Sequence, residues 1–176
     1  DHFKESLWAD PTADYHEFSL LGILEGLRNE FPGKEQFQIL FLQKCLDALL
    51  HNFENRVWAE QEFKKGIEFK VKGLPAGRQG IGFETVNDMV LPLAQKAGFG
   101  IVLRKDPRKG YVRIKVRPDR DFDLTPVYEK LKRMDPRATW FLHISKKMLL
   151  NGTTKNPKMK VTRLSLEEII EVLKSV

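Results

Sequence analysis

The heptapeptide YVRIKVR, residues 111–117, alternates strictly between apolar residues and residues that are charged or aromatic. Successive side chains of a β-strand point to opposite faces, so the alternation predicts a strand with two different faces. The apolar face carries Val112, Ile114 and Val116. The opposite face carries Tyr111, Arg113, Lys115 and Arg117. The pattern therefore predicts that one face enters a core while the other presents a row of cations headed by an aromatic ring.

Residues on both sides of this strand predict further strands and helices. Before it we expect a strand over 67–71, a helix over 85–96 that Pro92 kinks, and a strand over 99–104 that forms a hairpin with 111–117. After it we expect a helix from Thr125, a hairpin of 139–145 with 148–150, and a last helix opened by a Ser165–Glu168 capping box. The predicted fold class is α+β, a mixed sheet with helices on one face.

The region before the sheet reads as a helical connector. Apolar residues spaced by threes and fours predict one helix that ends near Phe31 and a second helix over 34–65. The second helix carries the stripe Ile39, Leu42, Leu46, Leu49 and Phe53. We expect so long a helix to bridge, to clamp, or to pair with a second copy in a homodimer. The predicted domains are a connector, 1–66, and a basic substrate-binding domain, 67–176.

The charge of the chain is divided unequally between these two domains. Residues 1–66 contain 7 Lys and Arg against 12 Asp and Glu, whereas residues 67–176 contain 23 against 12. The basic domain is therefore expected to meet a polyanion, with nucleic acid or a nucleotide phosphate as the partner. No run of about 18 apolar residues is present, which excludes a membrane span, and no membrane partner is expected. Cys45 has no second cysteine to pair with, so a reducing, cytoplasmic location is expected.

The outer face of strand 111–117 is the first candidate binding surface. A guanidinium group can bind two oxygens of one phosphate through two hydrogen bonds, and an aromatic ring can stack on a base. The alternative is a solvated edge strand that its charges protect against aggregation. The sequence leaves both interpretations open.

The stretch from Trp140 to Lys155 is the second candidate. An imidazole, amides, hydroxyls and amines gathered around a glycine-containing turn suit a phosphate, a sugar or a terminal nucleotide. The candidate residues are His143, Lys146, Lys147, Asn151, Thr153 and Lys155. Here too an alternative stands, since a single histidine beside aromatic residues also serves purely structural roles.

Catalytic and metal-binding patterns are absent from the sequence. The four histidines are scattered, and Asp119, Asp121 and Asp123 lack the later Gly and Glu of a calcium loop. The glycine-rich segment 73–82 lacks the Gly-Lys-Ser/Thr ending of a phosphate loop, which favours a surface loop. We therefore expect no catalytic residue, no metal ligand and no cofactor in this chain.

Three stretches carry a resemblance to a known family. They are Asp10-Pro11-Thr12 with the helix end RVWA at 56–59, the strand YVRIKVRP at 111–118, and WFLHIS at 140–145 with Asn-Gly-Thr at 151–153. They resemble the C-terminal half of the melanocyte-proliferating-gene family, metal-dependent hydrolases of the DHH phosphoesterase superfamily implicated as RNA exonucleases. The resemblance implies the substrate-binding and connector portion of such a phosphoesterase. A divalent, manganese-type metal would belong to a catalytic half, in cis or in trans, whose motifs this sequence does not contain.

Other functions remain open beside this one. The main alternative is a non-catalytic RNA- or DNA-binding module that dimerises through its long helix. A third is an interaction protein whose basic face meets an acidic protein.

Overall fold

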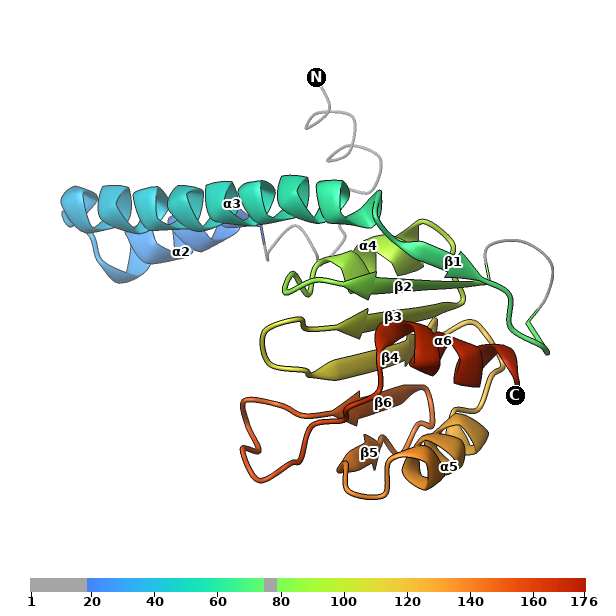
Figure 1. The fold of residues 1–176 in the computed structure, drawn as a ribbon. Helices are drawn as coiled ribbons and strands as arrows, with labels where there is room; N and C mark the ends of the chain where they lie inside the picture. The colour runs from blue at the N-terminus through green and yellow to red at the C-terminus, as the bar shows by residue number, and fades with distance from the viewer. Residues whose placement is uncertain (1–18, 75–78) are drawn as a thin grey trace. The chain divides into compact units, whose positions relative to one another are not determined.

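The computed structural model describes residues 19–74 and 79–176. The elements, in chain order, are α2 (Leu20–Glu30), α3 (Glu35–Phe63), β1 (Ile67–Phe69), β2 (Gly80–Glu84), α4 (Val90–Lys96), β3 (Ile101–Lys105), β4 (Val112–Val116), α5 (Thr125–Met134), β5 (Trp140–Leu142), β6 (Met148–Asn151) and α6 (Leu166–Lys174). Figure 1 shows them along the chain. The stretch Asp10-Pro11-Thr12 lies outside the described residues.

Backbone contacts divide the chain into two units between Phe53 and Glu54, within α3. The first unit contains α2 and the larger part of α3. The Ser19 Oγ caps α2 by accepting a hydrogen bond of 3.1 Å from the Gly22 N–H. The predicted domain boundary at residue 66 stays a prediction, but Ala59 and Phe63 at the end of α3 pack on the core of the second unit.

Apolar side chains of the first unit are exposed to an unusual degree. Neither α2 nor the part of α3 before Phe53 contains a buried residue. The large exposed apolar residues are Leu20, Leu21, Ile23, Phe31, Phe37, Ile39, Leu40, Leu46, Leu49, Leu50 and Phe53. Pairing of α3 with a second copy stays a prediction. None of the helices in the described ranges combines the length and apolar character that a bilayer crossing requires.

The second unit is built on a six-stranded mixed sheet of order β1-β2-β3-β4-β6-β5. β2 and β3 are parallel and joined through α4, whereas all other neighbours are antiparallel. The α+β class, the mixed sheet and the two predicted hairpins are confirmed. The capping box of Ser165 and Glu168 at the start of α6 is also present.

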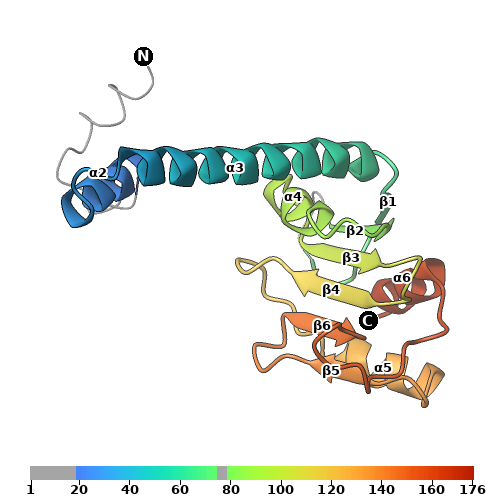
Figure 2. The ribbon, with the colours of Figure 1, turned by 90° about the vertical axis from the view of Figure 1, so that its left-hand side faces the viewer.

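Helices cover both faces of this sheet, where the sequence predicted one. The larger core cluster joins α5 and α6 to the apolar face of β4, through residues such as Ile114, Leu131 and Ile169. The smaller cluster joins α4 and the end of α3 to the opposite face of β2 and β3, through Phe83 and Val102. Figures 1 and 2 show α4 on one side of the sheet and α6 on the other. The sequence prediction missed the second covered face because it placed residues 73–82 in a surface loop, whereas Gly80, Ile81 and Gly82 begin the buried strand β2.

Pro92 does not kink α4, contrary to expectation. The helix begins at Val90, five residues later than predicted, so Pro92 lies in its first turn. A proline is tolerated there because the backbone N–H groups of the first turn have no partner within the helix. The residues predicted as the start of the helix instead form a turn, in which the Asn87 Oδ1 accepts a hydrogen bond of 2.9 Å from the Met89 N–H.

Candidate nucleic-acid interface

The strand β4 lies inside the sheet and not at its edge. It pairs with β3 on one side and with β6 on the other. All of its backbone polar groups therefore face neighbouring strands, and no edge needs the protection of charged side chains. The cations of this strand therefore do not protect an edge. They lie on the outer face of an antiparallel sheet, where either water or a ligand can meet them.

The registers of three strands define one continuous surface, which we call the open face. Arg113 of β4 stands opposite Leu150 of β6, which stands opposite Phe141 of β5. In the next row, Lys115 stands opposite Met148, and the Met148 carbonyl accepts a hydrogen bond of 2.9 Å from the His143 N–H. Since residues opposite one another in a sheet share a face, these side chains lie together.

No helix of the second unit packs on the open face. Its neighbours on β2 and β3 lie under α4, whereas the core side of β4, β6 and β5 lies under α5 and α6. Phe141 is 50% exposed, which is high for a phenylalanine in a strand. A half-exposed aromatic ring beside lysine and arginine is the composition of surfaces that stack and neutralise single strands.

The cations on this face are not equally available. Arg113 Nη1 lies 2.7 Å from Asp88 Oδ2, and Asp88 Oδ1 in turn lies 2.8 Å from Nε of the buried Arg104. Burial lowers the pKa of Arg104 because it penalises the charged form, and Asp88 and Asp106 compensate that charge. Lys115 has no carboxylate within ion-pair distance among the described residues. It is therefore the cation of β4 that is freest to meet a phosphate.

His143 is held in place by its own turn. Its Nδ1 accepts a hydrogen bond of 3.2 Å from the Ser145 N–H and lies 2.8 Å from the Ser145 Oγ. Because the backbone N–H occupies Nδ1, the neutral ring carries its proton on Nε2. The imidazole is thus left with one donor, at Nε2, for a ligand.

The remaining predicted residues are not gathered on the open face. Arg117 follows β4 and pairs with Asp119 at 2.8 Å. Lys146 pairs with Asp123 at 3.0 Å, and Lys147 donates to the Arg120 carbonyl. Hydrogen bonds from Thr125 hold the pKa of Asp123 below its ordinary value, so Asp123 stays ionised beside Lys146. Thr153 and Lys155 lie in the loop that follows β6.

Asn151 is the one predicted site residue that the structure removes from any surface. It is fully buried. Its Nδ2 donates to the Thr139 and Lys160 carbonyls at 2.9 and 3.1 Å, and its Oδ1 accepts from the Thr162 N–H at 2.7 Å. Every polar atom of the side chain is therefore engaged in holding the chain together, and none is left for a ligand.

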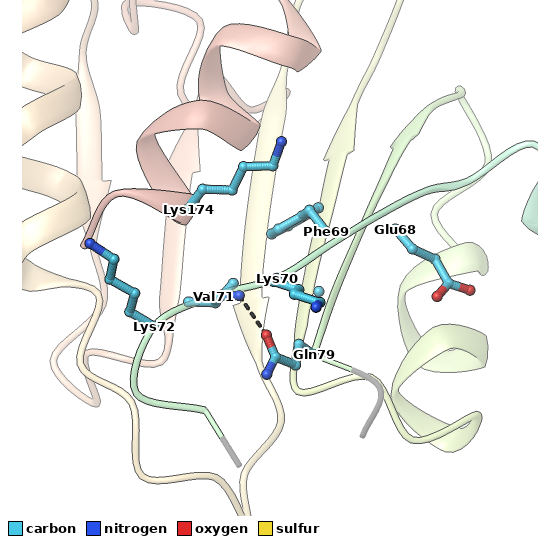
Figure 3. A pocket seen from close by; sticks show the side chains of 8 residues that line it. Glu68, Phe69, Lys70, Val71, Lys72, Gln79 and Lys174 are labelled. Carbon is cyan, nitrogen blue, oxygen red and sulfur yellow. Dashed lines mark hydrogen bonds between the residues drawn. The ribbon is translucent and has the colours of Figure 1, made fainter. Parts of the chain in front are cut away.

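Another cleft of the second unit, of about 990 Å³, lies beside β1. Its cations are Lys70, Lys72 and Lys174, and Figure 3 shows their amines pointing in different directions. Lys174 also pairs with Glu171 at 2.7 Å, and the Gln79 Oε1 is engaged by the Val71 N–H. Because the amines do not converge, this cleft lacks a point at which an anion would be held.

The described residues contain no group of three or more histidine, cysteine, aspartate or glutamate side chains placed to hold a metal ion. The chain matches no protein-family model, no curated protein and no solved structure. The functional interpretation therefore rests on the geometry of the open face.

Proposed function

We propose that the second unit binds single-stranded nucleic acid on the open face. The observation that carries this proposal is the uncovered row formed by Lys115, Arg113 and the half-exposed Phe141 on three neighbouring strands. The cations of β4 have no edge to protect, and the ring of Phe141 beside them offers a surface on which a base can stack.

A single strand suits this face better than a duplex does. Three strands spaced by about 4.8 Å make a nearly flat platform that enters neither groove of a double helix. The aromatic ring of Phe141 becomes useful only when a base is free to leave its neighbours and stack on it. The open face therefore favours unpaired bases, with the backbone phosphates near Lys115 and Arg113.

The first test measures the dependence of binding on salt for Lys115→Gln and Arg113→Gln. We expect Lys115→Gln to weaken binding of a fluorescent single-stranded RNA by about two- to fivefold, the value of an exposed ion pair. The slope of log affinity against log salt should become about 0.7 less negative. The variant makes one phosphate contact fewer and therefore releases fewer counterions on binding. Arg113→Gln should reduce the slope less, since Asp88 already offsets its charge.

Fluorescence anisotropy at several salt concentrations measures the binding. Two variants serve as controls. Lys132→Gln removes the same charge from α5, on the opposite side of the sheet, and should leave the slope unchanged. Asp88→Asn frees Arg113 and should tighten binding. A wild-type protein that does not bind at 50 mM salt, or an equal loss for Lys115→Gln and Lys132→Gln, would remove the open face as the interface.

The resemblance to DHH-superfamily phosphoesterases supports a narrower form of this proposal. In that form the chain is the substrate-binding and connector portion of a metal-dependent exonuclease, and a separate catalytic half would hold the manganese-type metal. The open face would then deliver a strand to a catalytic half in cis or in trans. The chain would contribute binding and orientation, while the metal would supply the activated water.

This narrower form predicts that the chain alone cleaves no labelled single-stranded RNA, with or without manganese. The reason is that no set of ligands for a metal pair assembles among the described residues. Gel analysis of the RNA after incubation decides the matter. Metal-dependent cleavage that persists through repurification and disappears in His143→Ala or Asp123→Ala would place catalysis in this chain.

A further inference from the structure

A second cationic surface lies at the end of β4, in a cleft of about 740 Å³. Three segments far apart in the sequence line it: the turn before β4, the turn after α5 and the chain between β6 and α6. The residues that give it its chemical character are Lys109, Tyr111, Asp135, Arg137, Lys160 and Arg163. Four of these six are cations, and only Tyr111 also belongs to the outer row of β4.

None of the four cations forms an ion pair with a described residue. The single carboxylate of the lining, Asp135, does not pair with these cations. Its Oδ2 accepts hydrogen bonds of 2.9 Å from both the Thr162 hydroxyl and the Arg163 N–H. These bonds, that from the Arg163 N–H foremost, hold the pKa of Asp135 below its ordinary value. Asp135 therefore stays ionised as an anchor of the cleft wall and leaves most of the positive charge uncompensated.

The wall of the cleft is built rigidly from the backbone. Asp106 Oδ1 accepts hydrogen bonds of 2.8 and 3.0 Å from the Arg108 and Lys109 N–H groups, which fixes the turn that presents Lys109. Tyr111 lies against the backbone of Gly152, where a Cβ would fall 2.3 Å from the Tyr111 ring. Gly152 is thus required for the ring to lie flat, and the ring forms a fixed side of the cleft.

Four unpaired cations around a fixed ring select for a compact, multiply charged anion. An internal phosphodiester carries one charge, for which Lys115 on the open face suffices. A phosphomonoester carries −1.5 to −2 charges at neutral pH and three acceptor oxygens, which suit a cluster of arginines and lysines. From these features we infer that the cleft binds a phosphomonoester, namely the terminal phosphate of the strand that lies on the open face. This inference rests on the proposed function.

The position of Tyr111 connects the two surfaces. It precedes Arg113 by two residues and Lys115 by four, so it stands about 13 Å along β4 from Lys115. A strand of a few nucleotides that follows β4 from Lys115 therefore reaches the cleft, where Tyr111 can pack against its last sugar or base. In this arrangement the open face holds the body of the strand and the cleft recognises its end.

The experiment compares three oligonucleotides of one sequence: unphosphorylated, 5′-phosphorylated and 3′-phosphorylated. We expect one terminal phosphate to tighten binding by at least about tenfold, since hydrogen bonds to charged groups are worth about 1.5–3 kcal/mol. The double variant Arg137→Gln/Arg163→Gln should lose this gain yet keep its affinity for the unphosphorylated strand within about twofold. The control Lys64→Gln/Lys132→Gln removes two charges elsewhere and should keep the gain.

The outcomes separate this inference from the proposed function. Lys115→Gln should weaken all three oligonucleotides by the same factor, because it acts on the body of the strand. Equal affinity of the three for the wild-type protein would overturn the inference and leave the proposed function standing. Binding of adenosine monophosphate that needs Arg137 and Arg163, without any gain for a phosphorylated strand, would assign the cleft to a free nucleotide and overturn its role at a strand end.

Discussion

Asn151→Leu is expected to lower the free energy of unfolding by about 3 kcal/mol or more. The substitution keeps the branched shape of the side chain, but it leaves the buried Thr162 N–H and the partly buried Thr139 carbonyl without their partner. Each such group costs about 1–3 kcal/mol. The Lys160 carbonyl keeps its hydrogen bond of 2.8 Å from the Thr139 N–H, so it is not fully orphaned. Urea unfolding followed by tryptophan fluorescence measures the change as a lower midpoint.

The matched control is Asn156→Leu, in the exposed loop after β6. It makes the same chemical change where water can replace the lost contact, and should alter stability by less than about 0.5 kcal/mol. Because Asn151 ties β6 to the segment that forms one wall of the cleft, Asn151→Leu should also abolish the gain from a terminal phosphate. Equal unfolding midpoints for Asn151→Leu and the wild-type protein would show that the three hydrogen bonds do not hold this segment.

The strands and their pairing into hairpins could be predicted because their signals are local. The alternation of 111–117 gives β4 and its two faces, and the turn between 105 and 110 gives its pairing with β3. The Ser165–Glu168 spacing gives the start of α6. In each case the residues that determine the structure lie within a few positions of one another, so a local sequence pattern is enough to predict it.

The members of the open face could be predicted only in part. The outer residues of β4 followed from alternation, and Phe141 falls on the same strand face as His143. What alternation cannot tell is that β6 lies between β4 and β5, which places Phe141 in one row with Arg113. Nor can it show that Asp88, 25 residues earlier in the chain, has already paired with Arg113.

Asn151 shows why residue type misleads about burial. An asparagine beside a glycine is typical of an exposed turn, and the sequence therefore placed it among the binding residues. In the structure its amide is the partner of three backbone groups at residues 139, 160 and 162. These backbone groups lie 9 to 12 residues away in the chain, so the residues next to Asn151 do not indicate that its side chain will bind them. The cations of the cleft, Arg137, Lys160 and Arg163, were missed for the same reason.

The double variant Phe141→Ala/Lys115→Gln is expected to weaken binding of single-stranded RNA by about 80-fold, the midpoint of a range that begins at about tenfold. Loss of a stacked ring costs about 1–3 kcal/mol and loss of an exposed ion pair about 0.2–1 kcal/mol. The two side chains belong to different rows and different strands, so their effects should nearly add. Phe141 is half exposed and Lys115 lies outside the core, so the folded state should survive both changes.

Two further substitutions at residue 141 identify what the ring contacts. Phe141→Tyr keeps an aromatic face and should bind nearly as well as the wild-type protein. Phe141→Leu keeps the apolar area but not the stacking face, and should lose about as much affinity for RNA as Phe141→Ala. The loss should be similar for adenine-, cytosine- and uracil-rich strands, because every base offers a π-face. Ile144→Ala, at a side chain that is 93% exposed in the turn after β5, controls for general loss of apolar surface. If Phe141→Leu binds RNA as tightly as the wild-type protein, stacking is excluded, and the open face is better explained as a surface that docks an acidic protein through apolar contacts.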